Sequence, residues 1–185
     1  ELGGKSPFVA FADADLDAVV QQAVNQFDNA GQVCLAGTRL IVERSMVDAF
    51  LERFLQAAAA IRQGDPRDET TDIGPLITHE HFERVDGFVQ RAKAEGATVL
   101  LGGGPNEDLG GLYYRPTLFG GVPEGAEVLR KEVFGPVLTL QTFEEEDEAI
   151  ALANETDYGL AAIVYTGDRE RAERVSERVV AGTVW

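Results

Sequence analysis

Short apolar runs alternate with amphipathic stretches along this 185-residue chain, and that alternation is what most constrains its fold. The runs 7–12 and 160–166 are rich in Ala, Val and Phe or Ile, as expected of buried strands. Residues 46–63 and 78–95 instead repeat apolar side chains at helical spacing. Strands that alternate with helices predict an α/β fold: an open, largely parallel sheet with helices on both faces. Further strands are expected at 39–43, 97–101, 113–119, 137–143 and 183–185, and further helices at 16–29, 144–155 and 168–180.

The composition predicts one globular domain. Hydrophobic residues make up 44% of the chain and charged residues 26%, which is close to the average for soluble folded proteins and argues against disorder. A chain of this length is long enough to bury a sizeable core. We therefore expect residues 1–185 to form a single α/β domain.

The charge and the cysteine content exclude several classes of function. The net charge of −16 argues against binding to nucleic acid or to anionic membranes, because both need a basic surface. No apolar run is long enough to span a bilayer, and no signal peptide is visible. A single cysteine excludes an intramolecular disulfide and suits a reducing compartment. The sequence thus predicts a cytoplasmic protein with no nucleic-acid or membrane partner.

The only cysteine, Cys34, has two interpretations. It is either a small buried hydrophobe with an inert thiol or a catalytic nucleophile. The expected helix at 16–29 is followed by Gly31 at the position of a helix C-cap, which places Cys34 in a short loop just beyond the helix end. Loops held by rigid elements commonly present reactive groups, so we favour the nucleophile.

Three short motifs bear on the role of Cys34. Residues 29–34 read N-x-G-Q-x-C, residues 1–5 read E-L-G-G-K, and residues 132–136 read E-V-F-G-P. Together they resemble the cysteine, glutamate and cofactor signatures of the aldehyde dehydrogenase superfamily, in that family's order and at about its spacing. The resemblance covers essentially the whole chain, although the chain covers only part of the family's length. It implies an open α/β catalytic domain that uses NAD or NADP to oxidise an aldehyde to a carboxylic acid.

The chemistry of that reaction requires few protein groups. A thiolate adds to the aldehyde carbon to give a thiohemiacetal, loss of hydride leaves a thioester, and a general base activates the water that releases the acid. Cys34 is the candidate nucleophile, and its own backbone N–H is a candidate oxyanion donor. By resemblance, Glu1 is the general base. We interpret Asn29 as structural, helping to form the loop.

The cofactor assignments also rest on resemblance. Glu132 and Phe134 are similar to the family residues that hold the nicotinamide ribose hydroxyls and pack against the nicotinamide ring. The backbone of Leu2 and Gly3 is expected near the nicotinamide amide. Spacing alone would suggest an ordinary surface glutamate and a core phenylalanine, and the following Gly-Pro favours the functional interpretation.

Other sequence features do not predict sites. His79 and His81 are two residues apart, point to different faces of a helix and have no third ligand, so no metal site is expected. The glycines at 102–104 form a turn, and no dinucleotide-binding fingerprint follows a strand. We therefore expect the chain to be truncated, with the dinucleotide-binding domain outside it, and the isolated chain to be inactive.

Two alternatives stay open. The chain could act as a non-catalytic interaction or oligomerisation fragment of such an enzyme, since a domain separated from its neighbours exposes an apolar face. A cysteine hydrolase is less well supported, because the imidazoles of His79 and His81 are expected on a distant helix.

Further expectations concern the reaction and the assembly of the whole enzyme. Glu1 favours hydrolysis over transfer to coenzyme A, because acylating branches of the family generally lack that glutamate. The sequence of residues 31–39 is similar to that of family members that oxidise muconic-type semialdehydes. The sequence does not distinguish NAD from NADP. By resemblance, the full enzyme is expected to be a homo-oligomer.

Overall fold

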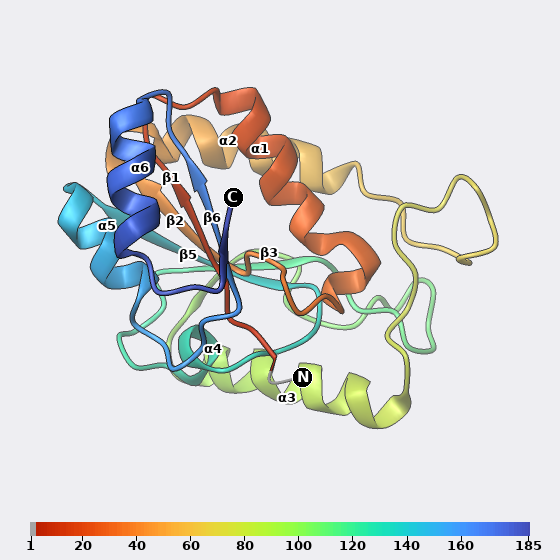
Figure 1. Ribbon diagram of the computed structural model, residues 1–185. Helices are drawn as coiled ribbons and strands as arrows, with labels where there is room; N and C mark the ends of the chain where they lie inside the picture. The colour runs from red at the N-terminus through yellow and green to blue at the C-terminus, as the bar shows by residue number, and fades with distance from the viewer. Residues whose placement is uncertain (1–2) are drawn as a thin grey trace.

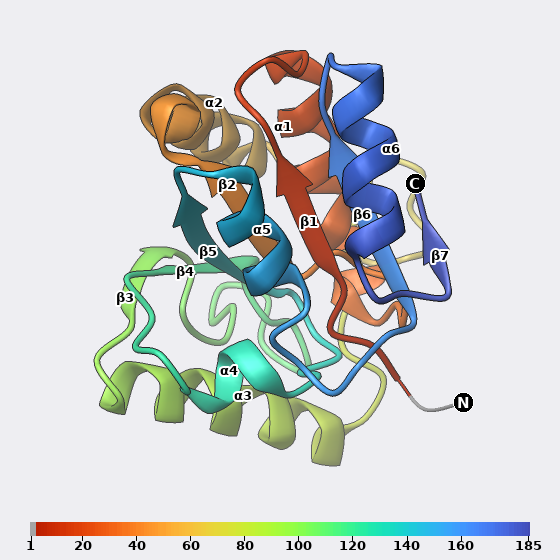
Figure 2. The same cartoon turned by 60° about the vertical axis from the view of Figure 1, so that its left-hand side comes forward.

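The computed structural model describes residues 3–185 and contains a seven-stranded sheet in the order β3-β4-β5-β2-β1-β6-β7 (Figures 1 and 2). All neighbouring strands are parallel except β3 and β4. The predicted α/β class is confirmed. The strands are β1 Pro7–Ala10, β2 Arg39–Glu43, β3 Thr98–Leu101, β4 Thr117–Gly120, β5 Val137–Phe143, β6 Ala161–Tyr165 and β7 Thr183–Val184. The helices are α1 Leu16–Val24, α2 Val47–Ala59, α3 His79–Ala94, α4 Glu127–Arg130, α5 Glu146–Ala153 and α6 Arg169–Arg178.

The central strand β1 shows how the sheet builds two apolar layers. Phe8 and Ala10 pack with α1 and α2, whereas Val9 and Phe11 pack with α5 and α6 on the opposite face. Because side chains alternate across a strand, a run that is apolar at every position must be covered on both sides. Figure 2 shows the two pairs of helices on either side of the strands.

A third apolar cluster lies beneath the sheet. The helix α3 contributes Val85 and Val89, which pack with Phe119 of β4 and Val137 of β5. Figures 1 and 2 show α3 and α4 below the ends at which the parallel strands begin. This placement brings α3 next to the segments that lead into those strands.

The helix expected at 16–29 ends earlier than predicted. Asp15 caps α1 by accepting hydrogen bonds from the backbone of its first turn, and α1 stops at Val24. A 3-10 segment, Asn25–Gly31, follows and is interrupted by left-handed backbone at Asn29, Ala30 and Gly31, with φ of 50°, 54° and 68°. Three consecutive left-handed residues reverse the chain direction, so the predicted C-cap at Gly31 is the end of a tight loop rather than of a helix.

The second helix also differs from its prediction at both ends. Residues 44–46 form a 3-10 turn, α2 starts at Val47, and the Ser45 hydroxyl donates to the carboxylate of Glu43. At the other end α2 stops at Ala59, and beyond it the backbone N–H of Arg62 bonds to the carboxylate of Asp72. By contrast, α3 begins with a side-chain cap, because the Thr78 hydroxyl accepts from the backbone N–H of His81.

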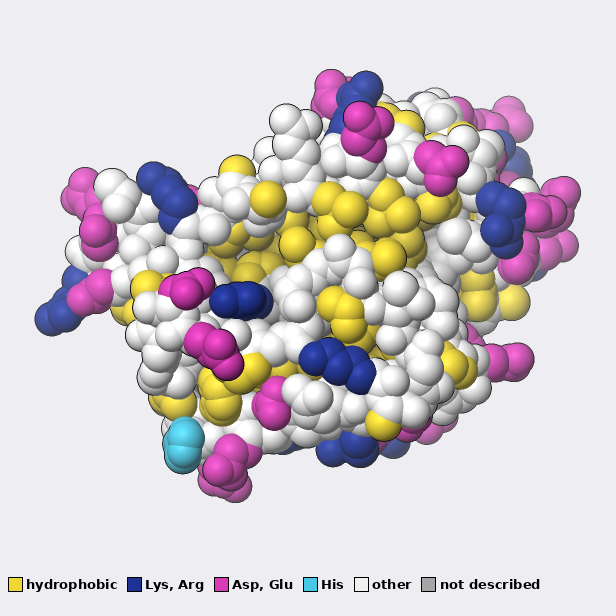
Figure 3. Space-filling model, turned by 180° about the vertical axis from the view of Figure 1, so that it is seen from behind, with side chains coloured by type: hydrophobic (Ala, Val, Ile, Leu, Met, Phe, Trp, Pro, Cys, Tyr) yellow, Lys and Arg dark blue, Asp and Glu magenta, His cyan; other side chains and the backbone are white. Residues whose placement is uncertain are grey.

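The outer surface of the molecule carries uncovered apolar groups. Viewed from behind, hydrophobic side chains gather in a band across the middle of the face (Figure 3). None of the helices within residues 3–185 has the length and apolar character needed to cross a bilayer.

Candidate active site

Four segments meet at one edge of the sheet. Residues 3–6 lead into β1, residues 34–38 into β2, residues 132–136 into β5 and residues 157–160 into β6. These four strands are parallel neighbours in the order β5-β2-β1-β6, so the segments lie side by side at their amino ends. Ligands in open α/β sheets more often bind beyond the carboxyl ends. We call residues 27–38 the cysteine loop and residues 132–136 the E-x-F segment.

The cysteine loop presents a free thiol near solvent. Cys34 is half-buried and lies between Val33 and Leu35, which are 36% and 38% exposed. The loop is held by Gln32, whose side chain accepts from the backbone N–H of Ile77 at 3.0 Å and donates to the carbonyl of Asn29 at 2.9 Å. The amide of Asn29 donates in turn to the carbonyl of Gln32. Asn29 thus has the structural contact expected of it, and Cys34 lies outside the apolar core.

The glutamate motif approaches the other two motifs through Gly3 and Gly4. The N–H of Gly4 donates to Glu132 Oε1 at 3.0 Å. A Cβ on Gly4 would lie 2.3 Å from the carbonyl oxygen of Cys34, and one on Gly3 would lie 2.3 Å from Glu132 Oε2. The contact at Gly4 is with backbone and permits only glycine, while Gly3 is favoured by its positive φ of 73°. All three motifs are therefore in direct contact.

The cysteine loop and the E-x-F segment also touch each other. A Cβ on Gly31 would lie 2.1 Å from the carbonyl oxygen of Gly135. The residue before Gly135, Phe134, is half-buried and left-handed, with φ of 58°. Left-handed backbone is unfavourable for a residue with a bulky side chain, so the surrounding contacts must hold Phe134 in place.

Two side chains of α3 supply those contacts. His81 Nε2 lies 2.6 Å from the carbonyl oxygen of Phe134, and the two rings meet edge to face. Arg84 donates to the carbonyl oxygens of Val133 and Glu132 at 2.7 and 2.8 Å. The expectation that the histidine-bearing helix is distant was wrong. Sequence reasoning missed His81 and Arg84 because about fifty residues separate them from their partners, as the sequence separations of 48 to 53 show.

Two buried cations lie behind the site. Each guanidinium nitrogen of Arg39 donates one hydrogen bond, to the carbonyl oxygens of Lys5, Leu152 and Ala153 at 3.0, 2.7 and 2.7 Å. Burial lowers the pKa of Arg39 to about 10. The ammonium of Lys5 is buried with no hydrogen-bond partner among residues 3–185. Burial, aided by the charge of Arg39 and opposed by that of Glu132, lowers the pKa of Lys5 to about 7.

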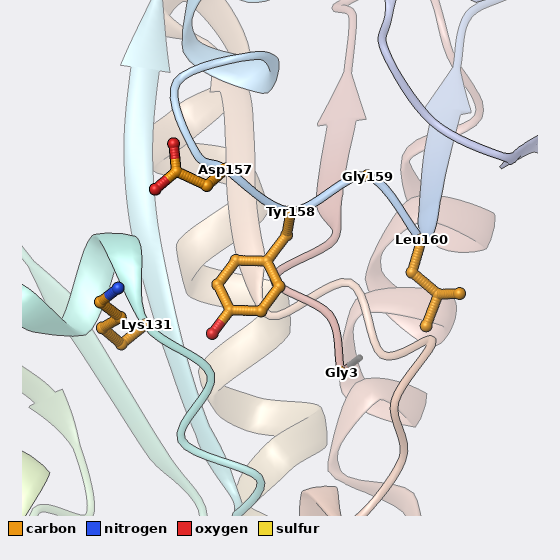
Figure 4. Close-up of a pocket in the computed structure, with 6 residues that line it drawn as sticks. All are labelled: Gly3, Lys131, Asp157, Tyr158, Gly159 and Leu160. Atoms are coloured by element: carbon orange, nitrogen blue, oxygen red, sulfur yellow. The ribbon is translucent and has the colours of Figure 1, made fainter. Parts of the chain in front are cut away.

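A pocket of about 500 Å³ opens beside these segments. Its lining consists of Gly3, Lys131, Asp157, Tyr158, Gly159 and Leu160, shown in Figure 4. Tyr158 extends from the segment before β6, and its hydroxyl accepts from the backbone N–H of Glu132 at 3.4 Å. The exposed side chain of Leu160 gives the pocket an apolar wall. Neither Tyr158 nor Leu160 belongs to the three motifs, so no sequence signal marked them as site residues.

The predicted site residues can now be placed. Gly3 and Glu132 are in contact, and Phe134 lies two residues after Glu132 in the E-x-F segment. The carbonyl oxygen of Cys34 lies against Gly4. The candidate base Glu1 and its neighbour at position 2 lie outside the described residues.

Comparison with known proteins identifies the family. The model for the aldehyde dehydrogenase family matches residues 1–185. The chain belongs to that family. Aldehyde dehydrogenase relatives include the betaine aldehyde dehydrogenases of Rhizobium johnstonii, 46% identical over 188 aligned residues, and of Cereibacter sphaeroides, 45% identical over 186. Each alignment covers all of this chain, but the chain spans only 39% and 38% of those relatives' lengths.

Solved aldehyde dehydrogenases have the same fold. Betaine aldehyde dehydrogenase from Staphylococcus aureus, in complex with NAD+, superposes with a TM-score of 0.96 at 42% identity. An NAD-dependent aldehyde dehydrogenase from Sinorhizobium meliloti gives 0.96 at 44% identity. These matches cover all of this chain and 38% and 37% of the solved chains.

Proposed function

We propose that this chain is the thiol-bearing α/β part of an NAD-dependent aldehyde dehydrogenase that oxidises an aldehyde to a carboxylic acid. The observation that carries the proposal is the contact between the cysteine loop, the Glu132 carboxylate and the Gly3–Gly4 backbone beside an open pocket. In this proposal residues 1–185 form one catalytic domain, and the dinucleotide-binding domain lies elsewhere in the enzyme.

Cys34 is proposed as the nucleophile. Its thiolate adds to the aldehyde carbon, and the backbone N–H of Cys34 donates to the oxyanion that forms. The partial exposure of Cys34 supports this role, because a nucleophile must meet its substrate. The thioester that follows is released by water activated by Glu1, whose carboxylate favours hydrolysis over transfer to coenzyme A.

The residues around Glu132 fit a nicotinamide nucleotide. One carboxylate oxygen of Glu132 is held by the N–H of Gly4, which leaves the carboxylate able to accept from paired ribose hydroxyls. The ring of Phe134 and the side chain of Leu160 offer apolar surface to a planar ring. When bound, the nicotinamide supplies the acceptor for the hydride. The NAD+ complexes of the solved relatives support NAD over NADP.

The relatives suggest a first substrate class. Betaine aldehyde appears in the names of three of the four relatives described above, so we take aldehydes of that kind as the leading candidate. Muconic-type semialdehydes, indicated by the sequence of residues 31–39, are the second candidate class. Initial rates of the whole enzyme on both classes and on simple aliphatic aldehydes would rank them.

The thiol can be tested in two forms of the protein. We expect an alkylating reagent to modify Cys34 in the chain and to abolish NAD-dependent aldehyde oxidation by the whole enzyme, as should Cys34→Ser. The chain alone should not reduce NAD+, because the rest of the dinucleotide site is proposed to lie outside it. An unreactive thiol combined with tight self-association would favour the interaction fragment instead, and the hydrophobic band in Figure 3 supports that as the second candidate. Coenzyme A dependence would overturn the hydrolytic assignment.

A cysteine hydrolase receives no support from the imidazole of His81. A carbonyl oxygen can only accept a hydrogen bond, so His81 Nε2 must carry the proton that it shares with the carbonyl of Phe134. That nitrogen is therefore not available to deprotonate Cys34.

A further inference from the structure

Three consecutive carbonyl oxygens of the E-x-F segment are bonded to one face of α3. Arg84 donates to the carbonyl oxygens of Glu132 and Val133, and His81 bonds to that of Phe134. His81 and Arg84 are three residues apart, so they lie on the same face of the helix. Carbonyl groups at the start of a strand would otherwise turn to water or to neighbouring backbone.

The two donors are suited to fixing a backbone. A guanidinium group is planar and presents donors in a rigid fork, so Arg84 sets the relative orientation of two successive peptide groups. The short bond from His81 fixes the next carbonyl, which belongs to the left-handed Phe134. Together they determine where the carboxylate of Glu132 and the ring of Phe134 can lie.

Close packing against α3 and against the cysteine loop also encloses the segment. A Cβ on Gly135 would lie 2.7 Å from a methyl of Val85 on α3, while Gly31 of the cysteine loop packs against the carbonyl of Gly135. The N–H of Glu132 is directed at the hydroxyl of Tyr158. The segment is thus held between α3 and the cysteine loop, and three of its carbonyl oxygens are bonded by two side chains of α3.

We propose that Arg84 and His81 are positioning residues for the nicotinamide half of the cofactor, acting through the carbonyl oxygens of residues 132–134. This inference rests on the proposed function. Neither side chain is assigned a contact with substrate or with the reacting atoms. Their effect is to present Glu132 and Phe134 in the arrangement that binds the cofactor, so that binding does not have to order the segment.

The test uses Arg84→Met in the whole enzyme, with Arg91→Met as the matched control. Arg91 lies on the same helix and over the same Phe88 ring, at 4.9 Å compared with 5.2 Å for Arg84, but pairs with Glu127 instead of the carbonyls. We expect Arg84→Met to weaken NAD+ binding, measured by titration, by about tenfold or more, since it removes two charge-assisted hydrogen bonds. Arg91→Met should leave the dissociation constant unchanged.

Three further readouts separate positioning from general damage. The KM for NAD+ should rise while kcat stays within about twofold, whereas a partly unfolded enzyme would lose kcat at constant KM. The rate of Cys34 alkylation without cofactor should not change. Arg84→Lys should restore part of the affinity, because an ammonium keeps the positive charge and the N–H donors but lacks the rigid planar fork that orients two successive carbonyls.

Substitutions of His81 provide an independent test of the inference. His81→Gln keeps an N–H donor and should bind NAD+ more tightly than His81→Phe. Equal NAD+ affinity in wild type, Arg84→Met and Arg91→Met would overturn the inference and leave the proposed function intact. A wild-type enzyme that neither binds NAD+ nor oxidises aldehydes would instead overturn the proposed function, and the inference with it.

Discussion

The buried ammonium of Lys5 predicts an unusual dependence of stability on pH. Its side chain is 1% exposed, and burial lowers its pKa from 10.5 to about 7. Arg39 contributes to this shift, whereas the carboxylate of Glu132 opposes it. Since one pKa unit corresponds to about 1.4 kcal/mol, the folded protein bears a cost of about 5 kcal/mol when Lys5 is charged in both states.

The sign follows from proton binding. Below pH 7 both the folded and the unfolded chain hold the proton of Lys5, and the full cost is present. Between pH 7 and 10.5 the unfolded chain still binds a proton that the folded chain has lost, so stability rises with pH by about 1.4 kcal/mol per unit. Above that range Lys5 is neutral in both states, and the cost is gone.

Replacing Lys5 by Met removes the charged ammonium and keeps an unbranched apolar side chain one atom shorter. We expect Lys5→Met to be more stable than wild type by several kcal/mol near about pH 6, with the advantage disappearing near about pH 10. Urea unfolding of both proteins across that range measures the difference, in which the titrating groups that do not interact with Lys5 cancel.

The exposed Lys131 provides the control, since Lys131→Met should change stability by the same small amount at every pH. Parallel stability curves for wild type and Lys5→Met would refute the reasoning, because a buried ammonium with a lowered pKa cannot give a difference that is independent of pH.

Two further changes test the local structure. Gly31→Ala should cost about 2 kcal/mol or more in urea unfolding, because its Cβ would lie 2.1 Å from the carbonyl oxygen of Gly135 in left-handed backbone, whereas Gly104→Ala meets nothing within 4 Å and should change stability little. Thr78→Ala should cost about 1 kcal/mol by removing the hydroxyl that caps α3 at the N–H of His81, and Thr78→Ser should restore it; equal stability of the Ala and Ser variants would contradict the capping role.

The strands were predicted from sequence more accurately than the helix ends. Strands β2 and β5 begin and end where expected, at 39–43 and 137–143, because their apolar residues must be buried between two layers of helices. Helix ends depend on competing local bonds. The turn at Asn29 ends the first helix region early, and the bond from Arg62 to Asp72 follows the early end of α2.

The candidate site was likewise only partly predictable from the sequence. Cys34, Glu132 and Gly3 could be selected because each belongs to a motif within a few consecutive residues. Their contacts depend on the strand order β5-β2-β1-β6, which brings together segments more than a hundred residues apart, such as Gly4 and Glu132 with a separation of 128. No local pattern encodes that order, and none marks Arg84 as a neighbour of the E-x-F segment.

The closest approaches at the site are made by main-chain atoms at glycines. Gly4 lies against the carbonyl of Cys34, and Gly31 lies against the carbonyl of Gly135. Distances fixed by peptide groups do not vary with the identity of the side chains nearby. Substitutions of side chains that line the pocket can therefore change which molecules enter it. The distance between the cysteine loop and the segment that carries Glu132 stays fixed by the backbone.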